Sequence, residues 1–191
     1  LTSCSIIGFG IASSKLDSNI SSALLWVIMF FTSMIGLSKS FVTEEERGTI
    51  LLLKLYSSSS AVYFGKLLFN IVLCVIINFF ASILFLFFIN QNEILSISIF
   101  WLSVILGSIA IGSASTIISA IISKANVKNA IFPVLSFPVM LPIIIAGLDA
   151  TRLSYSTNDL SEAITLFVQI IAFTIAIISI SYVLFSFVWN E

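Results

Sequence analysis

The sequence has 191 residues, of which 59% are apolar and 9% are charged, with a formal net charge of −1 at pH 7. Soluble domains carry about 45–50% apolar and about 25% charged residues, so this composition excludes a water-exposed globular surface and indicates an integral membrane protein. The chain has no histidine, and its two cysteines, Cys4 and Cys74, lie in apolar stretches. These features argue against histidine chemistry and Cys-x-x-Cys motifs, so we expect no catalytic residue, no metal ligand and no cofactor bound by this chain.

Continuous apolar windows predict transmembrane helices along the chain. The first apolar run, residues 1–14, is shorter than the roughly 20 residues that a helix needs to cross a bilayer, so we interpret it as a partial first span. Five longer windows follow at about residues 20–37, 67–89, 94–122, 131–148 and 163–189. The predicted fold is therefore all-α: a polytopic membrane helix bundle with six spans, forming a single transmembrane domain over residues 1–191.

The positions of the basic residues predict the orientation of the spans, because cytoplasmic connections carry an excess of Lys and Arg. One set of alternate connections contains only Lys15 and Arg152. The other set contains six cations: Lys39, Arg47, Lys54, Lys66, Lys124 and Lys128. We therefore expect the six-cation set to face the cytoplasm, together with the C-terminus.

The connection after the second span begins with a helix-start pattern. Thr43 is followed by Glu44, Glu45 and Glu46, which matches a capping box in which Glu46 returns to the backbone of Thr43. The three acids also complement the partial positive charge at the N-terminus of a helix. The pattern therefore predicts a short helix at the start of the segment formed by residues 43–60.

The same segment is apolar on one side, since three leucines share one helical strip: Leu51, Leu52 and Leu55. Such a strip favours a helix lying in the cytoplasmic interface. Four serines then interrupt the pattern as a loop, with Ser60 expected to cap the next helix. Two interpretations stay open: a solvated linker, or a docking element for a separate ATPase subunit. The chain has no phosphate-binding loop of its own, because Ser60 stands where Gly-x-x-x-x-Gly-Lys needs its first glycine.

Polar side chains recur every fourth residue in the third span, at Asn70, Cys74, Asn78 and Ser82. This spacing puts them on one face of the helix, which we expect to point into protein because a lipid-facing amide would lack hydrogen-bond partners. The pattern favours packing against other helices over a polar path for a substrate. The fourth span offers small residues four apart, typical of close helix packing: Ser103 and Gly107, Ser108 and Gly112, and Ser115, Ser119 and Ser123.

Pro138 and Pro142 interrupt the fifth span. They remove amides that would bond to the carbonyls of Val134 and Pro138, at about 3 kcal/mol each in an ordinary helix. The freed carbonyls are tolerated in a membrane where a neighbouring group or a water-lined cavity satisfies them. The span is therefore predicted to bend, either as a plain kink or as an element that lines a partner interface or cavity and moves during an ATP cycle.

The connection from Asp149 to Glu162 is predicted to lie outside the cytoplasm. It contains Arg152 and Tyr155, and its Asp159-x-x-Glu162 pattern predicts a cap for the last helix. Fourteen residues exceed a tight turn. The connection is either a simple polar loop or a contact for an extracytoplasmic partner.

Three stretches resemble a known family. The string "EEERGT" (44–49), the leucines after it and Gly65-Lys66 resemble the segment after the second span of ABC-2-type permeases. The stretches "LGSIAIGSASTIISAIISKANVKNA" (106–130) and "VLSFPVMLPIIIAG" (134–147) resemble, more narrowly, the CcmB family, the haem-exporter-like membrane subunit of cytochrome c maturation. Relatives in that family often carry a proline after the leucines, where this chain has the serines at 57–60.

This resemblance implies a non-catalytic permease subunit in the bacterial cytoplasmic (inner) membrane. It implies a CcmA-like ATPase subunit, CcmC-like and CcmD-like membrane partners, and release of a CcmE-like haem chaperone on the outer face. On this interpretation the contact with the ATPase subunit is formed by Glu44, Glu45, Glu46, Arg47, Gly48 and Thr49. Alternatives are a permease for a lipid, glycan or drug, and a membrane scaffold without any ATPase.

The absence of histidine bears on haem, because haem iron is held mostly by His, Cys, Met or Tyr in dedicated pockets. Met29, Met34, Met140 and the tyrosines show no paired arrangement along the sequence. We therefore expect partner subunits, and not this chain, to coordinate any haem.

Overall fold

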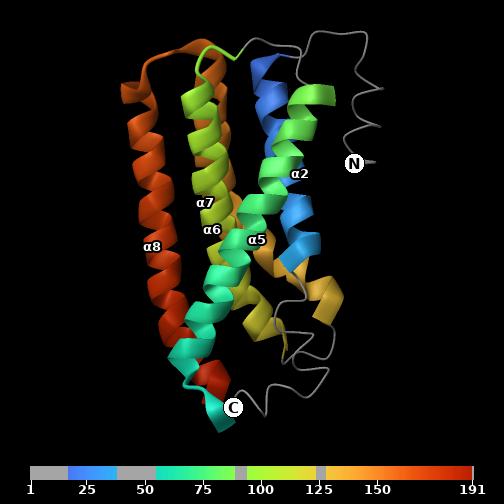
Figure 1. Cartoon of the computed structure of the whole chain (residues 1–191), viewed down its shortest axis with the longest axis vertical. Coiled ribbons are helices and arrows are strands. Elements are labelled where there is room, and N and C mark those ends of the chain that lie inside the picture. The colour runs from blue at the N-terminus through green and yellow to red at the C-terminus, as the bar shows by residue number, and fades with distance from the viewer. Residues whose placement is uncertain (1–16, 38–54, 89–93, 124–127, 191) are drawn as a thin grey trace.

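The computed structural model describes residues 17–37, 55–88, 94–123 and 128–190. This part of the chain contains five helices that run alternately up and down as one elongated bundle (Figure 1). By length and composition, each of the five can cross a membrane. The helices are α2 (Ser18–Leu37), α5 (Ser59–Phe88), α6 (Ile97–Ser123), α7 (Lys128–Ser156) and α8 (Leu160–Asn190).

The all-α prediction is confirmed for the described residues, in which the five full-length spans are all present as helices. Two predicted elements lie outside the described residues: the partial first span, residues 1–14, and residues 43–54 of the interfacial segment. The sixth crossing and the interfacial helix therefore stay predictions. At the end of the segment, Leu55 and Tyr56 are helical and largely exposed.

Two helices extend beyond their apolar windows. α5 begins at Ser59, and the Ala61 amide donates to Ser58 Oγ at 3.4 Å, so Ser58 and not Ser60 is the capping residue. α7 continues to Ser156, so most of the expected 14-residue connection is helical and only residues 157–159 link α7 to α8. A hydropathy window misses this extension because Arg152 faces outward while Thr151 and Ser154 keep one buried face.

α6 is the central helix of the bundle and contacts each of the other four (Figure 1). Nearly all of its second half is buried, because its side chains there are small enough for neighbours to approach on every side. The small pairs expected from the sequence are all buried, which confirms close packing along this helix. At Gly112 an added Cβ would lie 3.0 Å from the Ile71 Cα of α5, so here the two backbones are nearly in contact.

Trp26 of α2 is fully buried and acts as a wedge between α6 and α7. A Cβ atom added at Gly107 in α6, or at Gly147 in α7, would overlap the indole ring. The indole N–H donates to Thr151 Oγ1 of α7 at 2.9 Å, which satisfies the one polar atom of the ring. The two glycines therefore form a slot that fixes how α2 sits against α6 and α7.

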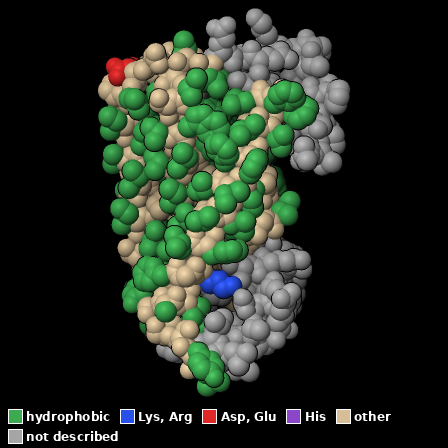
Figure 2. Space-filling view, in the orientation of Figure 1, with side chains coloured by type: hydrophobic (Ala, Val, Ile, Leu, Met, Phe, Trp, Pro, Cys, Tyr) green, Lys and Arg blue, Asp and Glu red, His purple; other side chains and the backbone are tan. Residues whose placement is uncertain are grey.

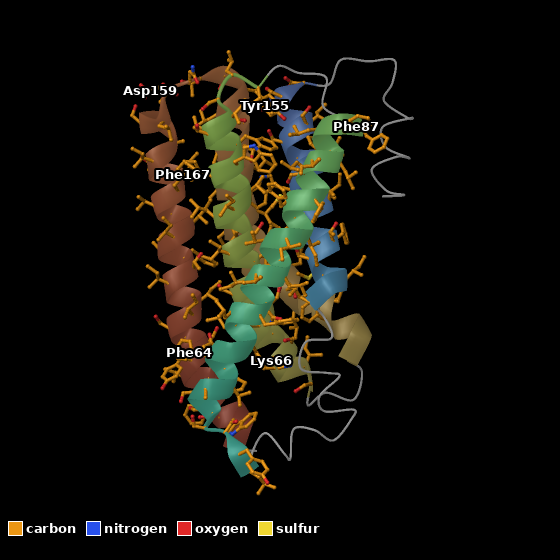
Figure 3. All side chains as sticks on the ribbon, viewed as in Figure 1. Phe64, Lys66, Phe87, Tyr155, Asp159 and Phe167 are labelled. Carbon is orange, nitrogen blue, oxygen red and sulfur yellow. The ribbon has the colours of Figure 1, made fainter. Side chains whose placement is uncertain are left out.

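The two ends of the bundle differ in charge. At the end where α8 begins, the described residues include Asp159, whose Oδ1 accepts the Ser161 amide at 3.0 Å and caps the helix as predicted. That hydrogen bond lowers the pKa of the Asp159 carboxyl. Lys66 lies toward the opposite end, and hydrophobic side chains cover much of the face between them (Figures 2 and 3). We call these the Asp159 end and the Lys66 end.

The Trp26 slot predicts opposite outcomes for two glycine substitutions. Gly147→Ala should destabilise the bundle by about 1–3 kcal/mol, because the new methyl group overpacks against the indole. The matched control is Gly65→Ala in α5, where nothing lies within 4 Å, and it should be neutral or stabilising by up to about 1 kcal/mol. Unfolding of both variants in detergent measures the difference, and equal stabilities would contradict the wedge.

Candidate functional site

The interior of the bundle contains a polar cluster on one face of α5. Asn70, Cys74, Asn78 and Ser82 are each 0% exposed. The hydrogen bonds of Asn70 and Asn78 reach α6 and α2, so this face is directed at those helices. The four-residue spacing in the sequence therefore corresponds to a continuous buried polar face.

Asn78 joins three helices at the centre of this cluster. Its Nδ2 donates to Ser108 Oγ of α6 at 3.1 Å, and its Oδ1 accepts from Ser33 Oγ of α2 at 3.2 Å. Cys74 Sγ lies 3.4 Å from both Asn78 Nδ2 and Ser33 Oγ. The side-chain amide uses its donor and its acceptor on different helices, so α2, α5 and α6 are tied together at one level.

A second interhelical hydrogen bond lies closer to the Lys66 end. Asn70 Nδ2 donates to Thr116 Oγ1 of α6 at 3.0 Å, and that hydroxyl donates to the Gly112 carbonyl at 2.8 Å. This bond sits where Gly112 allows the backbones of α5 and α6 to approach. The Asn70 hydrogen bond and the close approach of the two backbones at Gly112 therefore stabilise the same pair of helices.

The hydrogen bonds of the cluster favour a packing role. Among the described residues, no group of three or more Cys, Asp or Glu side chains could hold a metal ion. Two buried hydroxyls, Ser82 Oγ and Ser115 Oγ, have no hydrogen-bond partner within the described part of the chain. The amides, in contrast, are bonded across helices, which supports a packing role over a polar path for a substrate.

An apolar groove of about 250 Å³ lies between α2 and α7. It is lined only by hydrophobic residues: Trp26, Val27, Phe30, Phe31, Phe137, Leu141 and Ile144. With no polar atom at its surface, the groove can accommodate hydrocarbon or an aromatic ring but offers no ligand to a metal. Its floor includes the buried Trp26 ring, so the groove is next to the α2–α6–α7 slot.

Pro138 and Pro142 lie on the exposed side of α7, which remains helical through both. The residues that precede them, Phe137 and Leu141, line the apolar groove, whereas the proline side chains do not. Pro133 lies in the second turn of α7, because the helix begins at Lys128. A role for Pro138 and Pro142 in a moving helix stays a prediction.

A cavity of about 260 Å³ lies at the Lys66 end, where the start of α5 meets the last part of α8. Its lining contains Ser59, Ser60, Tyr182, Val183, Phe185 and Ser186. Aromatic contacts border it, with the Tyr63 and Phe185 ring centroids 5.3 Å apart and Phe185 and Trp189 5.6 Å apart. This junction therefore couples α5 and α8 near the point where the chain enters α5.

The predicted ATPase contact, Glu44 to Thr49, lies outside the described residues. The segment that contains it connects the end of α2 to the start of α5, so its two attachment points are both at the Lys66 end (Figure 1).

Two features of the bundle were not predicted from the sequence: the Trp26 slot and the aromatic junction of α5 with α8. Gly107 and Gly147 are the only sequence signal for the slot, and their common partner cannot be deduced from spacing.

Removing the Asn78 side-chain amide should lower the stability of the bundle, whereas removing the hydroxyl of a serine on the same face should not. Asn78→Ala breaks two interhelical hydrogen bonds and should cost about 1–3 kcal/mol. Ser82→Ala, four residues along the same face, removes a hydroxyl without a partner and should be nearly neutral. A double-mutant cycle of Asn78→Ala with Ser108→Ala, measured by unfolding in detergent, should give a non-zero coupling, and additive effects would contradict the bond.

Comparison with known proteins identifies the family. The family model described as "CcmB protein" matches residues 1–186, which is nearly the whole chain. No curated protein matches, and no solved structure does either. The family comprises transmembrane permease subunits of an ABC transporter for haem in cytochrome c biogenesis, and such subunits are not themselves catalytic. The apolar five-helix bundle and the match over residues 1–186 agree, and the chain belongs to the CcmB family.

Proposed function

We propose that this chain couples ATP hydrolysis in a separate ATPase subunit to haem delivery and release of a haem chaperone on the outer face of the bacterial inner membrane. The observation that carries the proposal is the family match over residues 1–186. It also argues against the two alternatives drawn from the sequence, an exporter of lipid, glycan or drug and a scaffold without an ATPase. The partners proposed are CcmA-like, CcmC-like, CcmD-like and CcmE-like proteins.

The Lys66 end is proposed to face the cytoplasm. Lys66 lies toward that end, and so do the connections that carry four further cations of the larger set and the start of α7, whose first residue is Lys128. The end of the chain after α8 is on the same side, so the C-terminus would be cytoplasmic. Among the described residues the acids Asp17, Asp149, Asp159 and Glu162 belong to the other end, which supports this orientation although acids count little in the rule.

The proposed mechanism is mechanical. Glu44, Glu45, Glu46, Arg47, Gly48 and Thr49 would engage the ATPase subunit, while the leucine strip anchors the segment in the membrane interface. Because the segment joins α2 to α5 directly, its displacement acts on two helices at once. The Ser33–Asn78–Ser108 bonds then connect that movement to α6.

Haem is the proposed cargo of the complex, with iron coordinated by partner subunits. The chain has no histidine, and Met29, Met34 and Met140 are at most 3% exposed within the bundle. The apolar groove between α2 and α7 offers no polar or ligating atom. These features support a subunit that transmits force and leaves ligation of haem to its neighbours.

A charge reversal in the connecting segment tests the motor contact. The double variant Glu46→Lys/Arg47→Glu should lose most of the ATPase subunit in detergent co-purification while the permease stays folded, because reversed charges repel the complementary groups of the partner. The matched control is Arg152→Glu/Glu162→Lys toward the Asp159 end, which should retain the ATPase subunit. Full retention by the first variant would remove the proposed contact.

Replacing prolines of α7 with alanine restores the missing backbone amides and tests whether α7 moves during the ATP cycle. Pro138→Ala/Pro142→Ala should straighten and stiffen α7, and cytochrome c assembly in cells should fall at an unchanged level of the permease. Pro133→Ala, nearer the start of the same helix, is the control and should assemble cytochrome c normally. Normal assembly by the double variant would show that the two prolines are only a static kink.

A further inference from the structure

Two apolar ridges border the groove between α2 and α7. The ridge on α2 includes Val27 and Phe31, and the ridge on α7 consists of Phe137, Leu141 and Ile144. Residues of each ridge follow one another at intervals of three or four, so each ridge runs along one side of its helix. Two such ridges with a groove of about 250 Å³ between them have the shape into which a third helix packs.

This side of α2 is open, whereas its other sides are packed. The helix contacts α5, α6 and α7 at the edge of the bundle (Figure 1). Its packing against α5 is close, since a Cβ atom added at Gly36 would lie 2.8 Å from Ile77 Cδ1. Val27 and Phe31, in contrast, are 50% and 57% exposed. The described bundle therefore leaves an apolar surface of α2 and α7 uncovered.

The chain itself contains a segment suited to this surface. Residues 1–14 are predicted from the sequence as a partial span, and residues 15–17 are all that separates them from Ser18, the first residue of α2. A link this short makes two consecutive helices antiparallel neighbours. A helix formed by residues 1–14 would therefore lie beside α2, on a side that α5, α6 and α7 leave open.

The depth of the groove matches the length of this segment. Trp26 and Phe31 lie eight and thirteen residues after Ser18, so the groove lies about 12 to 20 Å below the start of α2. A helix of 14 residues is about 21 Å long, so residues 1–14 would reach this depth.

The chemistry of the segment also matches the groove. The groove has no polar atom at its surface, and residues 1–14 contain no charged and no amide side chain. Their serine and threonine hydroxyls can donate to carbonyls of their own helix, as Ser103 does. The segment therefore brings no polar group that would need a partner inside the groove.

We propose that residues 1–14 form a helix that lies in the groove between α2 and α7, antiparallel to α2. Small residues make up much of the segment, and they leave room for the aromatic rings that line the groove. The groove is then a contact within the chain and not a site for a lipid tail. Phe137 and Leu141 directly precede Pro138 and Pro142, so this helix packs on the part of α7 that lacks two backbone amides.

Disulfide cross-linking in native membranes tests this position. On a Cys74→Ser background, Leu141→Cys in the groove is combined with one cysteine at residue 3, 4, 5 or 6, four positions that cover a full helical turn whatever the rotation of the helix. Cys4 is either kept, or replaced by serine when Ser3→Cys, Ser5→Cys or Ile6→Cys is introduced. A protease site inserted between α2 and α5 puts the two cysteines on different fragments. At least one of the four positions should give fragments that stay joined until a reductant is added.

Two controls place thiols on other exposed surfaces. Val139→Cys lies on α7 two residues from Leu141 and outside the groove, and Phe80→Cys lies on α5. In both controls the fragments should separate. The proposal is overturned if a control joins the fragments as well as Leu141→Cys does, if Leu141→Cys never joins them, or if disulfides form only between two copies of the chain.

A matched pair of phenylalanines measures the burial of the groove. Phe31 in the groove and Phe80 on α5 are 57% and 62% exposed within the described bundle. Because the proposed helix covers Phe31, Phe31→Ala should lower the midpoint of thermal unfolding in detergent by roughly 4–8 °C, and Phe80→Ala should lower it by much less. Equal shifts would overturn the proposal. Neither experiment involves the ATPase subunit or haem, so a negative result would leave the proposed function standing.

Discussion

The bundle depends on one constraint: a polar group inside a membrane is costly to leave without a partner in the protein, because hydrocarbon offers none. Many serine and threonine hydroxyls meet this constraint locally, as Ser103 and Ser136 do by donating to the carbonyl four residues earlier. Asn78 and Trp26 reach further, since the Asn78 amide and the indole N–H each donate to a hydroxyl on another helix. These longer side chains therefore determine which helices must lie next to one another.

The choice of α6 as the central helix follows from the same constraint. Its hydroxyls supply partners for Asn70 and Asn78, and its glycines give room for the α5 backbone and the Trp26 ring. A helix of large residues could provide neither function. α2, α5 and α6 are consequently joined at one level, so a force applied to the segment between α2 and α5 reaches the centre of the bundle and not only its edge.

The sequence is informative where the signal is local. The spacing of Asn70, Cys74, Asn78 and Ser82 is enough to predict one buried face, and Asp159 is recognisable as a helix cap from its position before Glu162. Apolar windows fail at α7, where a charged outward side hides a buried side from an averaged hydropathy. The Trp26 slot is beyond local reasoning, because its walls come from positions 107 and 147 and only the tertiary packing brings them together. The ATPase contact at residues 44–49 remains a prediction, since it lies outside the described residues.

The interior of the described bundle also restricts how it can contribute to transport. The polar cluster on α5 joins helices through neutral amide and hydroxyl groups and a thiol, and the groove between α2 and α7 is wholly apolar. Such an interior has no acid–base pair with which to move protons and no histidine with which to ligate iron. The proposed mechanism accordingly relies on a change in helix packing. α7 is the helix predicted to bend, because Pro138 and Pro142 lack the amides for two backbone bonds while Thr151 bonds the later part of the helix to Trp26. Bending would therefore concentrate between a fixed end near Thr151 and the Lys66 end, where an external ATPase would act.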